Sequence, residues 1–157
     1  MKKIFLFLTL IITLTANAQS FNEDKTAFSN FLKRMYTAKP FEGVKIVDDY
    51  DHQYLVSVIS LEKAKYTSES IMNRVAQVKA QSQASAFLNG ATISMNMVIT
   101  TKESKDSSNN VKTIVETVEQ IKQNSVGFSQ GLEFLTNFDN AASLRMVFIY
   151  IRELKKE

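Results

Sequence analysis

The chain has 157 residues, of which 45% are hydrophobic, with a formal net charge of +3 and no cysteine. The lack of cysteine excludes disulfide bonds, thiol catalysis, thiolate metal sites and the lipid-carrying residue of bacterial lipoproteins. Lysine and arginine gather only loosely at residues 152–156, without the basic stripe typical of nucleic-acid binding, so we expect no nucleic-acid partner.

Residues 1–18 are typical of a bacterial secretory signal peptide. Lys2 and Lys3 precede an apolar run, and Ala16-Asn17-Ala18 supplies a small-x-small cleavage site. The run is shorter than the roughly 20 apolar residues that span a bilayer. We therefore predict export to the periplasm or beyond, leaving residues 19–157 with a net charge of +1 and no transmembrane anchor.

An amphipathic helix is expected over residues 21–38, before Lys39-Pro40 ends it. Phe28, Phe31 and Met35 share an apolar stripe with Leu32 at spacings of three and four. Two interpretations stay open: the stripe packs on the rest of the domain, or it docks on a protein partner or a second copy. Phe28, Phe31 and Met35 are accordingly the candidate partner-binding residues.

Two strands and a second helix are expected next. Apolar residues alternate over residues 44–61 around the polar segment 48–53, which predicts a hairpin. Ser68 is suited to cap a helix ending at Asn89-Gly90. We expect its buried side to carry five residues: Ile71, Val75, Val78, Ser82 and Ala86. The small residues of segment 80–86 predict close packing on a sheet.

The remaining elements are a strand over 93–99, a flexible loop over 102–110 and a closing hairpin from Leu132 to Tyr150, in which Leu132, Phe134 and Phe138 alternate. Segment 111–118 suits either a helix or a strand, and we favour a helix over 113–124. The order α-β-β-α-β-α-β-β predicts an α+β fold: a single two-layer domain with helices on one face of a mainly antiparallel sheet.

Residues 54–152 resemble a group of small bacterial envelope proteins. The resemblance rests on three segments, Arg74 to Ser94, Val126 to Phe134 and Arg145 to Ile151. The group comprises the surface lipoproteins related to flagellar protein P and the N-terminal domain of flagellar assembly protein T. It implies an alanine-rich helix running into a long strand, a short helix, a final hairpin, and a structural or assembly role in the cell envelope.

One dense group of metal-binding or acid–base side chains stands at Asp48, Asp49, Asp51 and His52. Its oxygen-rich composition would suit calcium or magnesium, but the glycine and distal glutamate of an EF-hand are missing. A solvated hairpin turn is the favoured interpretation, and we expect no metal or other cofactor.

Gly127-Phe128-Ser129-Gln130-Gly131 matches the Gly-x-Ser-x-Gly pattern of hydrolases. That motif needs a strand before the serine and a helix after it, whereas a helix is expected before Ser129 and a strand after it. We therefore predict an exported, non-catalytic envelope protein with a binding or assembly role and a protein partner or self-association. The alternatives are a hydrolase using Ser129 or the Asp48–His52 group, and a small-ligand carrier.

Overall fold

The structure is a computed structural model, and it describes residues 24–49, 52–90, 97–100, 112, 115, 116, 118, 121 and 125–154. The predicted signal peptide and the loop 102–110 lie outside the described residues. The chain divides into two compact units, Met1–Pro40 and Phe41–Glu157. Nothing in the described part of the chain forms a helix that is both long and apolar enough to cross a membrane.

The first unit contains a helix over residues 24–38, which confirms the described part of the helix predicted there. Its buried residues are Phe28, Leu32 and Tyr36, one turn apart. Phe31 and Met35 lie beside this stripe and are partly exposed. The Phe28 and Phe31 rings stack with their centroids 6.5 Å apart.

The second unit contains a five-stranded sheet in the order β3-β1-β2-β5-β4. The strands are β1 (Gly43–Asp49), β2 (His52–Glu62), β3 (Val98–Thr100), β4 (Glu133–Asn140) and β5 (Arg145–Leu154). Both predicted hairpins are confirmed, since β1 pairs antiparallel with β2 and β4 with β5. β2 also pairs antiparallel with β5, and the short β3 runs parallel to β1. The sheet is therefore mostly antiparallel, as predicted.

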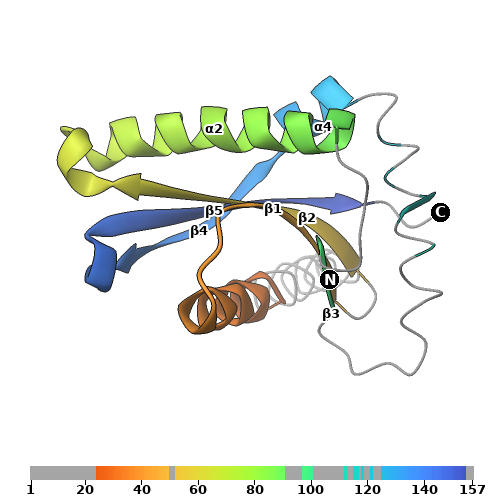
Figure 1. The fold of residues 1–157 in the computed structure, drawn as a ribbon, viewed down its shortest axis with the longest axis horizontal. Coiled ribbons are helices and arrows are strands. Elements are labelled where there is room, and N and C mark those ends of the chain that lie inside the picture. The colour runs from red at the N-terminus through yellow and green to blue at the C-terminus, as the bar shows by residue number, and fades with distance from the viewer. Residues whose placement is uncertain are drawn as a thin grey trace, which may run out of the picture. The chain divides into compact units, whose positions relative to one another are not determined.

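Helix α2 (Glu69–Gly90) lies along one face of this sheet (Figure 1). Its start agrees with the predicted cap, because the backbone N–H of Ile71 donates to Ser68 Oγ at 3.3 Å. Its last residue, Gly90, is also the predicted one. This packing of helix on sheet confirms the predicted α+β class.

The prediction of which side of α2 is buried was wrong. The buried stripe is Met72, Ala76, Ala80, Ala84 and Leu88. Ile71 and Val78, expected to face inward, are 44% and 66% exposed. Three alanines allow the helix axis to approach the sheet closely, which the bulkier β-branched side chains of the other stripe would prevent.

Residues 112, 115, 116, 118 and 121 are helical, which agrees with the favoured interpretation of that segment. Short helix α4 (Ser125–Gln130) follows. Gly127 lies inside α4. Val118 and Phe128 join the core under α2.

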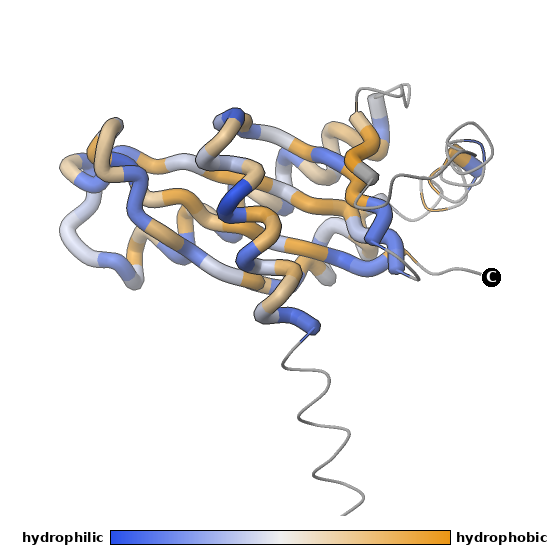
Figure 2. The backbone as a smooth tube through the Cα atoms, turned by 90° about the horizontal axis from the view of Figure 1, so that it is seen from below, coloured by the Kyte–Doolittle hydropathy of each residue, from blue (hydrophilic) through white to orange (hydrophobic). Residues whose placement is uncertain are grey.

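Each central strand buries side chains on both faces of the sheet. Toward α2 the core holds Ile46, Leu55, Ile59, Phe148 and Tyr150. The alternate positions carry aliphatic side chains that are at most 4% exposed: Val47, Val56, Val58, Val147, Ile149 and Ile151. In Figure 2 the backbone is accordingly coloured as hydrophobic along the middle of the strands and as hydrophilic near their ends.

Candidate functional site

An open groove of about 550 Å³ lies between α2 and the edge strand β4. α2 packs over β1, β2 and β5, so the helix-facing side of β4 is left uncovered. Five polar residues of α2 form one wall and two aromatic residues form the floor. The lining residues are Glu69, Ser70, Asn73, Arg74, Gln77, Phe134 and Tyr150.

The floor is an aromatic pair with one exposed and one buried member. Phe134 and Tyr150 are opposite each other in the β4–β5 register, and their rings meet edge to face with centroids 5.7 Å apart. Phe134 is 51% exposed and Tyr150 is 3% exposed. The Tyr150 hydroxyl donates to the Asn73 carbonyl at 3.1 Å, and burial raises the pKa of Tyr150 to about 12. The buried Tyr150 ring thus supports the Phe134 ring, which presents an exposed apolar surface to the groove.

A β-bulge between Phe134 and Thr136 places Phe134 in the groove. The extra residue reverses the alternation, so Phe134 faces α2 while Phe138 faces the other side of the sheet. The expected regular alternation of Leu132, Phe134 and Phe138 was therefore wrong. Without a covering helix above β4, the phenyl ring stays accessible.

One hydrogen bond joins α2 to β4 at the groove, and a second joins α2 to α4 farther along the helix. At one end Asn137 Nδ2 donates to Glu69 Oε1 at 2.9 Å. Beyond Gln77, the next turn of α2 is joined to the C-terminus of α4, because Gln81 Nε2 donates to the Gln130 carbonyl at 3.4 Å. The Asn137–Glu69 contact connects the start of α2 to the edge strand.

The groove carries one charge without a partner. Arg74 is exposed and makes no hydrogen bond or ion pair with any of the residues that the structure describes. Glu69, the other charged lining residue, is engaged by Asn137. A guanidinium that offers five N–H donors next to an exposed phenyl ring can receive a carboxylate and an apolar group together.

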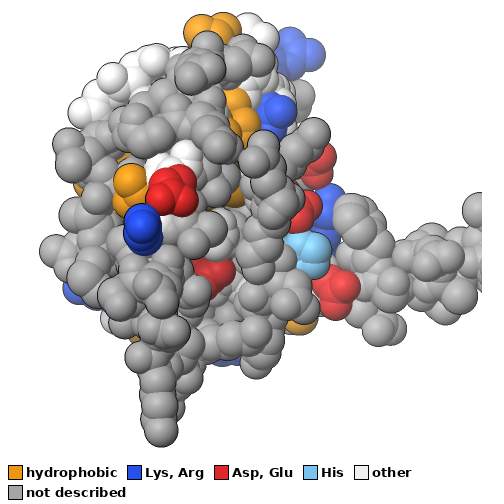
Figure 3. Space-filling view, turned by 90° about the vertical axis from the view of Figure 1, so that its right-hand side faces the viewer, with side chains coloured by type: hydrophobic (Ala, Val, Ile, Leu, Met, Phe, Trp, Pro, Cys, Tyr) orange, Lys and Arg blue, Asp and Glu red, His pale blue; other side chains and the backbone are white. Residues whose placement is uncertain are grey.

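Three of the four candidate residues of the acidic turn lie within the described residues. Asp49 is opposite His52 and Asp48 is opposite Gln53 in the β1–β2 register, while Asp51 lies outside the described residues. His52 Nδ1 lies 2.7 Å from Glu153 Oε1 on β5. The pale-blue histidine stands at the surface beside acidic side chains in Figure 3. Within the described ranges no group of three or more His, Cys, Asp or Glu side chains could hold a metal ion.

Ser129 lies inside α4 and is 4% exposed. Its hydroxyl donates to the Val126 carbonyl at 3.0 Å. The helix precedes β4, so the segment has the helix-then-strand order expected from the sequence and not the strand-turn-helix order of a nucleophile elbow. No hydrogen bond in the described part of the chain links Ser129 to His52.

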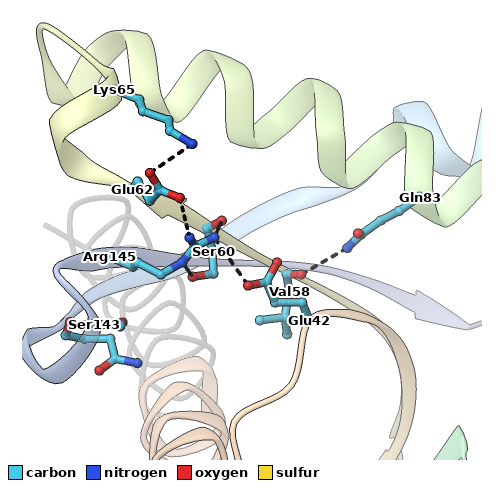
Figure 4. A network of polar contacts seen from close by, with 9 residues as sticks. Glu42, Val58, Ser60, Glu62, Lys65, Gln83, Ser143 and Arg145 are labelled. Atoms are coloured by element: carbon cyan, nitrogen blue, oxygen red, sulfur yellow. Dashed lines mark hydrogen bonds and ion pairs between the residues drawn. The ribbon is translucent and has the colours of Figure 1, made fainter.

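A polar cluster around Arg145 lies where β5 begins (Figure 4). Arg145 donates to Ser60 Oγ at 2.6 Å and to the Ser60 carbonyl at 2.7 Å. Its Nη1 also lies 3.2 Å from Glu62 Oε1, and its Nη2 lies 3.5 Å from Glu42 Oε1. Lys65 pairs with the other oxygen of Glu62 at 2.9 Å. The cluster neutralises its own charges and is a structural feature of the sheet.

The comparisons with known proteins give no relative. No family model matches the chain, and neither the curated proteins nor the solved structures contain a significant match. The resemblance to proteins related to flagellar protein P therefore stays a prediction.

The groove residues Arg74, Phe134 and Tyr150 were not among the candidates taken from the sequence. Arg74 looks like any exposed helix residue, and the exposure of Phe134 depends on a bulge that leaves no clear local signal. The candidates Phe28, Phe31 and Met35 belong to the first unit, and their docking role stays a prediction.

Proposed function

We propose that this protein is an exported, non-catalytic component of the cell envelope that acts by binding a protein partner. The observation that carries the proposal is the groove between α2 and β4, where an accessible phenyl ring lies beside an unpaired guanidinium and an open sheet edge. Exposed aromatic and arginine side chains are the types most often central to protein interfaces. The N-terminal sequence supports export.

The alternative chemistry has less support in the contacts. The Ser129 hydroxyl donates a hydrogen bond to a backbone carbonyl of its own helix, and His52 Nδ1 contacts the Glu153 carboxylate. A nucleophile and its base must lie within hydrogen-bond reach of each other or move there. Each side chain instead has a partner of its own, the Val126 carbonyl for Ser129 and Glu153 for His52.

A capture experiment on native envelope extract tests the proposal. Tagged protein is cross-linked in the extract beside a Phe134→Ser variant and a Val78→Ser control, which removes a more exposed apolar side chain outside the groove. We expect one partner to be captured by the wild type and the control and lost with Phe134→Ser. Recovery of monomer alone from all three proteins would overturn the proposal.

A further inference from the structure

We propose that the groove binds an extended peptide that adds as a strand to β4, with an acidic side chain on Arg74 and an apolar side chain on Phe134. This inference rests on the proposed binding function and gives the partner its chemistry. It combines three separate observations: the open edge, the apolar floor and the unpaired charge.

The edge of β4 can accept another strand. Among the described strands only β5 pairs with β4, and no second described strand lies beside the outer row of its backbone N–H and C=O groups. The strand contains neither proline nor lysine, two residues that commonly protect edges from further pairing. Its bulge is confined to the Phe134 end, and residues 136–140 pair regularly with β5. Strand addition would therefore use the regular stretch 136–140, which follows the bulge at Phe134.

The groove gives the added strand side-chain specificity. Alternate residues of a strand point to the same face, so every second peptide residue would face α2. One such residue meets Phe134, whose ring contacts the Tyr150 ring edge to face. A residue two positions away on the same face would lie along the α2 wall, which holds Arg74.

Charge complementarity selects an acidic peptide. Asp139 on β4 is already paired with Lys63 at 2.8 Å, and Glu69 accepts a hydrogen bond from Asn137. The groove-lining charge left without a partner, within the described residues, is the guanidinium of Arg74. A carboxylate can bind it through two parallel hydrogen bonds, which neither a neutral nor a basic side chain can do.

A displayed library of random peptides of about seven residues, the usual length of a strand, tests this proposal on the full chain. We expect selected peptides to carry Asp or Glu two positions from an aromatic or aliphatic residue. N-methylation of backbone nitrogens along one edge of such a peptide should weaken binding at least about tenfold, because strand pairing needs those N–H groups.

Charge reversal provides the sharpest arm of the experiment. Arg74→Glu should weaken binding of the acidic peptide about tenfold or more and strengthen binding of a peptide in which Lys replaces the acidic residue. Lys79→Glu, a matched change on α2 away from the groove, should leave both affinities unchanged. Phe134→Ser should weaken the binding of both peptides. Thermal unfolding of each variant checks that the fold is retained.

The outcomes separate this inference from the proposed function. If a native partner still binds Arg74→Glu and Phe134→Ser, or the library yields no peptide that depends on them, the peptide inference is wrong while a binding role stands. If no partner is captured, the proposed function itself fails. A concentration-dependent dimer abolished by Phe134→Ser would assign the groove to a second copy of the chain and overturn the peptide inference.

Discussion

Arg152 holds the C-terminal end of α4 against β5. Its Nη1 donates to the carbonyls of Gly127 and Phe128, and its guanidinium carbon lies 4.3 Å from the centre of the Phe128 ring. The last carbonyls of a helix lack partners within the helix, so this arginine acts as a capping residue supplied by a distant strand. Its position depends on the small size of the residue after α4.

Gly131→Ala should disrupt this contact. A Cβ at Gly131 would come within 2.5 Å of Arg152 Cζ, so the guanidinium must move away from the α4 carbonyls. We expect a loss of no more than about 1 kcal/mol in the free energy of unfolding, measured by urea denaturation, because the displaced atoms are the end of a flexible side chain. In an Arg152→Ala background the same change should cost much less, because the clash is gone. Equal costs in both backgrounds would contradict this explanation.

Tyr150 should make the protein sensitive to alkaline pH. Burial raises its pKa from 10.0 to about 12, so the folded state retains the phenolic proton more tightly than the unfolded state. The stabilisation is complete below pH 10 and is lost as the pH rises from 10 to 12. Denaturant unfolding across this range should show that loss in the wild type.

Tyr150→Phe should remove this part of the alkaline loss. At neutral pH the free energy of unfolding of the variant should be about 1 kcal/mol lower, the usual net value of a hydrogen bond such as the one lost to the Asn73 carbonyl. Tyr66→Phe is the matched control, because Tyr66 is a second tyrosine that packs against the core. An unchanged alkaline slope in Tyr150→Phe would assign the loss to other groups.

At the scale of elements, the alanine stripe of α2 sets the distance between helix and sheet. Ala76, Ala80 and Ala84 are fully buried, and the Ser57 hydroxyl on β2 donates to the Ala80 carbonyl at 3.3 Å. A sheet side chain reaches the helix backbone only when the two layers are close. The groove beside β4 inherits its geometry from this packing.

Ala80→Leu should destabilise the fold by about 1–3 kcal/mol, because the larger side chain must separate α2 from β2 or adopt a strained rotamer. Val78→Leu, on the exposed face of the same helix, should change stability by no more than about 0.5 kcal/mol. Thermal or urea unfolding measures both. A tolerated Ala80→Leu would show that the helix–sheet distance is adjustable.

The same helix shows what the sequence could and could not predict. Its ends followed from Ser68 and Gly90, because capping and termination depend on residues close in the chain. Its buried side did not, because the hydrophobic stripe of Ile71, Val75 and Val78 was more apolar than the alanine stripe that is buried. Close packing favours small residues over hydrophobic ones, and only the facing sheet determines that choice.

The groove was hidden for a related reason. Phe134 was correctly assigned to a strand, but the bulge that turns it toward α2 and the short reach of α2 over β4 are tertiary features. Polar residues such as Arg74 and Asn73 gave no pattern that distinguishes a groove wall from a solvated helix face. The candidate site could therefore be found only from the packed structure.

At the scale of the whole second unit, the sheet is closed by pairing between distant segments. The hairpins β1–β2 and β4–β5 are local and were predicted, whereas β2–β5 pairing joins residues such as Gln53 and Leu154. The parallel β1–β3 contact likewise has no local signal. The final strand lies between β2 and β4, so the sheet that supports the groove is complete only when the C-terminal segment is in place.

Arg145 joins the segments that this topology brings together. It links β5 to Ser60 and Glu62 of β2 and to Glu42 at the entry to β1. Glu62 has a pKa below its ordinary value of 4.5, chiefly because Lys65 donates a hydrogen bond to it, with Arg145 adding to the effect and partial desolvation opposing it. Its contribution to stability is therefore present above pH 4.5 and is lost as the pH falls through the lowered pKa.

Arg145→Met should lower the free energy of unfolding by about 1–3 kcal/mol at neutral pH, because the buried Ser60 hydroxyl and carbonyl lose a charged donor. The loss of the ion pair with Glu62 adds to this effect. Arg145→Lys should recover only part of this, since an ammonium cannot reproduce the planar fork that contacts both residues. The difference between wild type and Arg145→Met should shrink in urea denaturation at acidic pH, where Glu62 is protonated. A difference independent of pH would show that Arg145 acts through Ser60 and side-chain packing alone, and that the ion pair with Glu62 contributes nothing to closing the sheet.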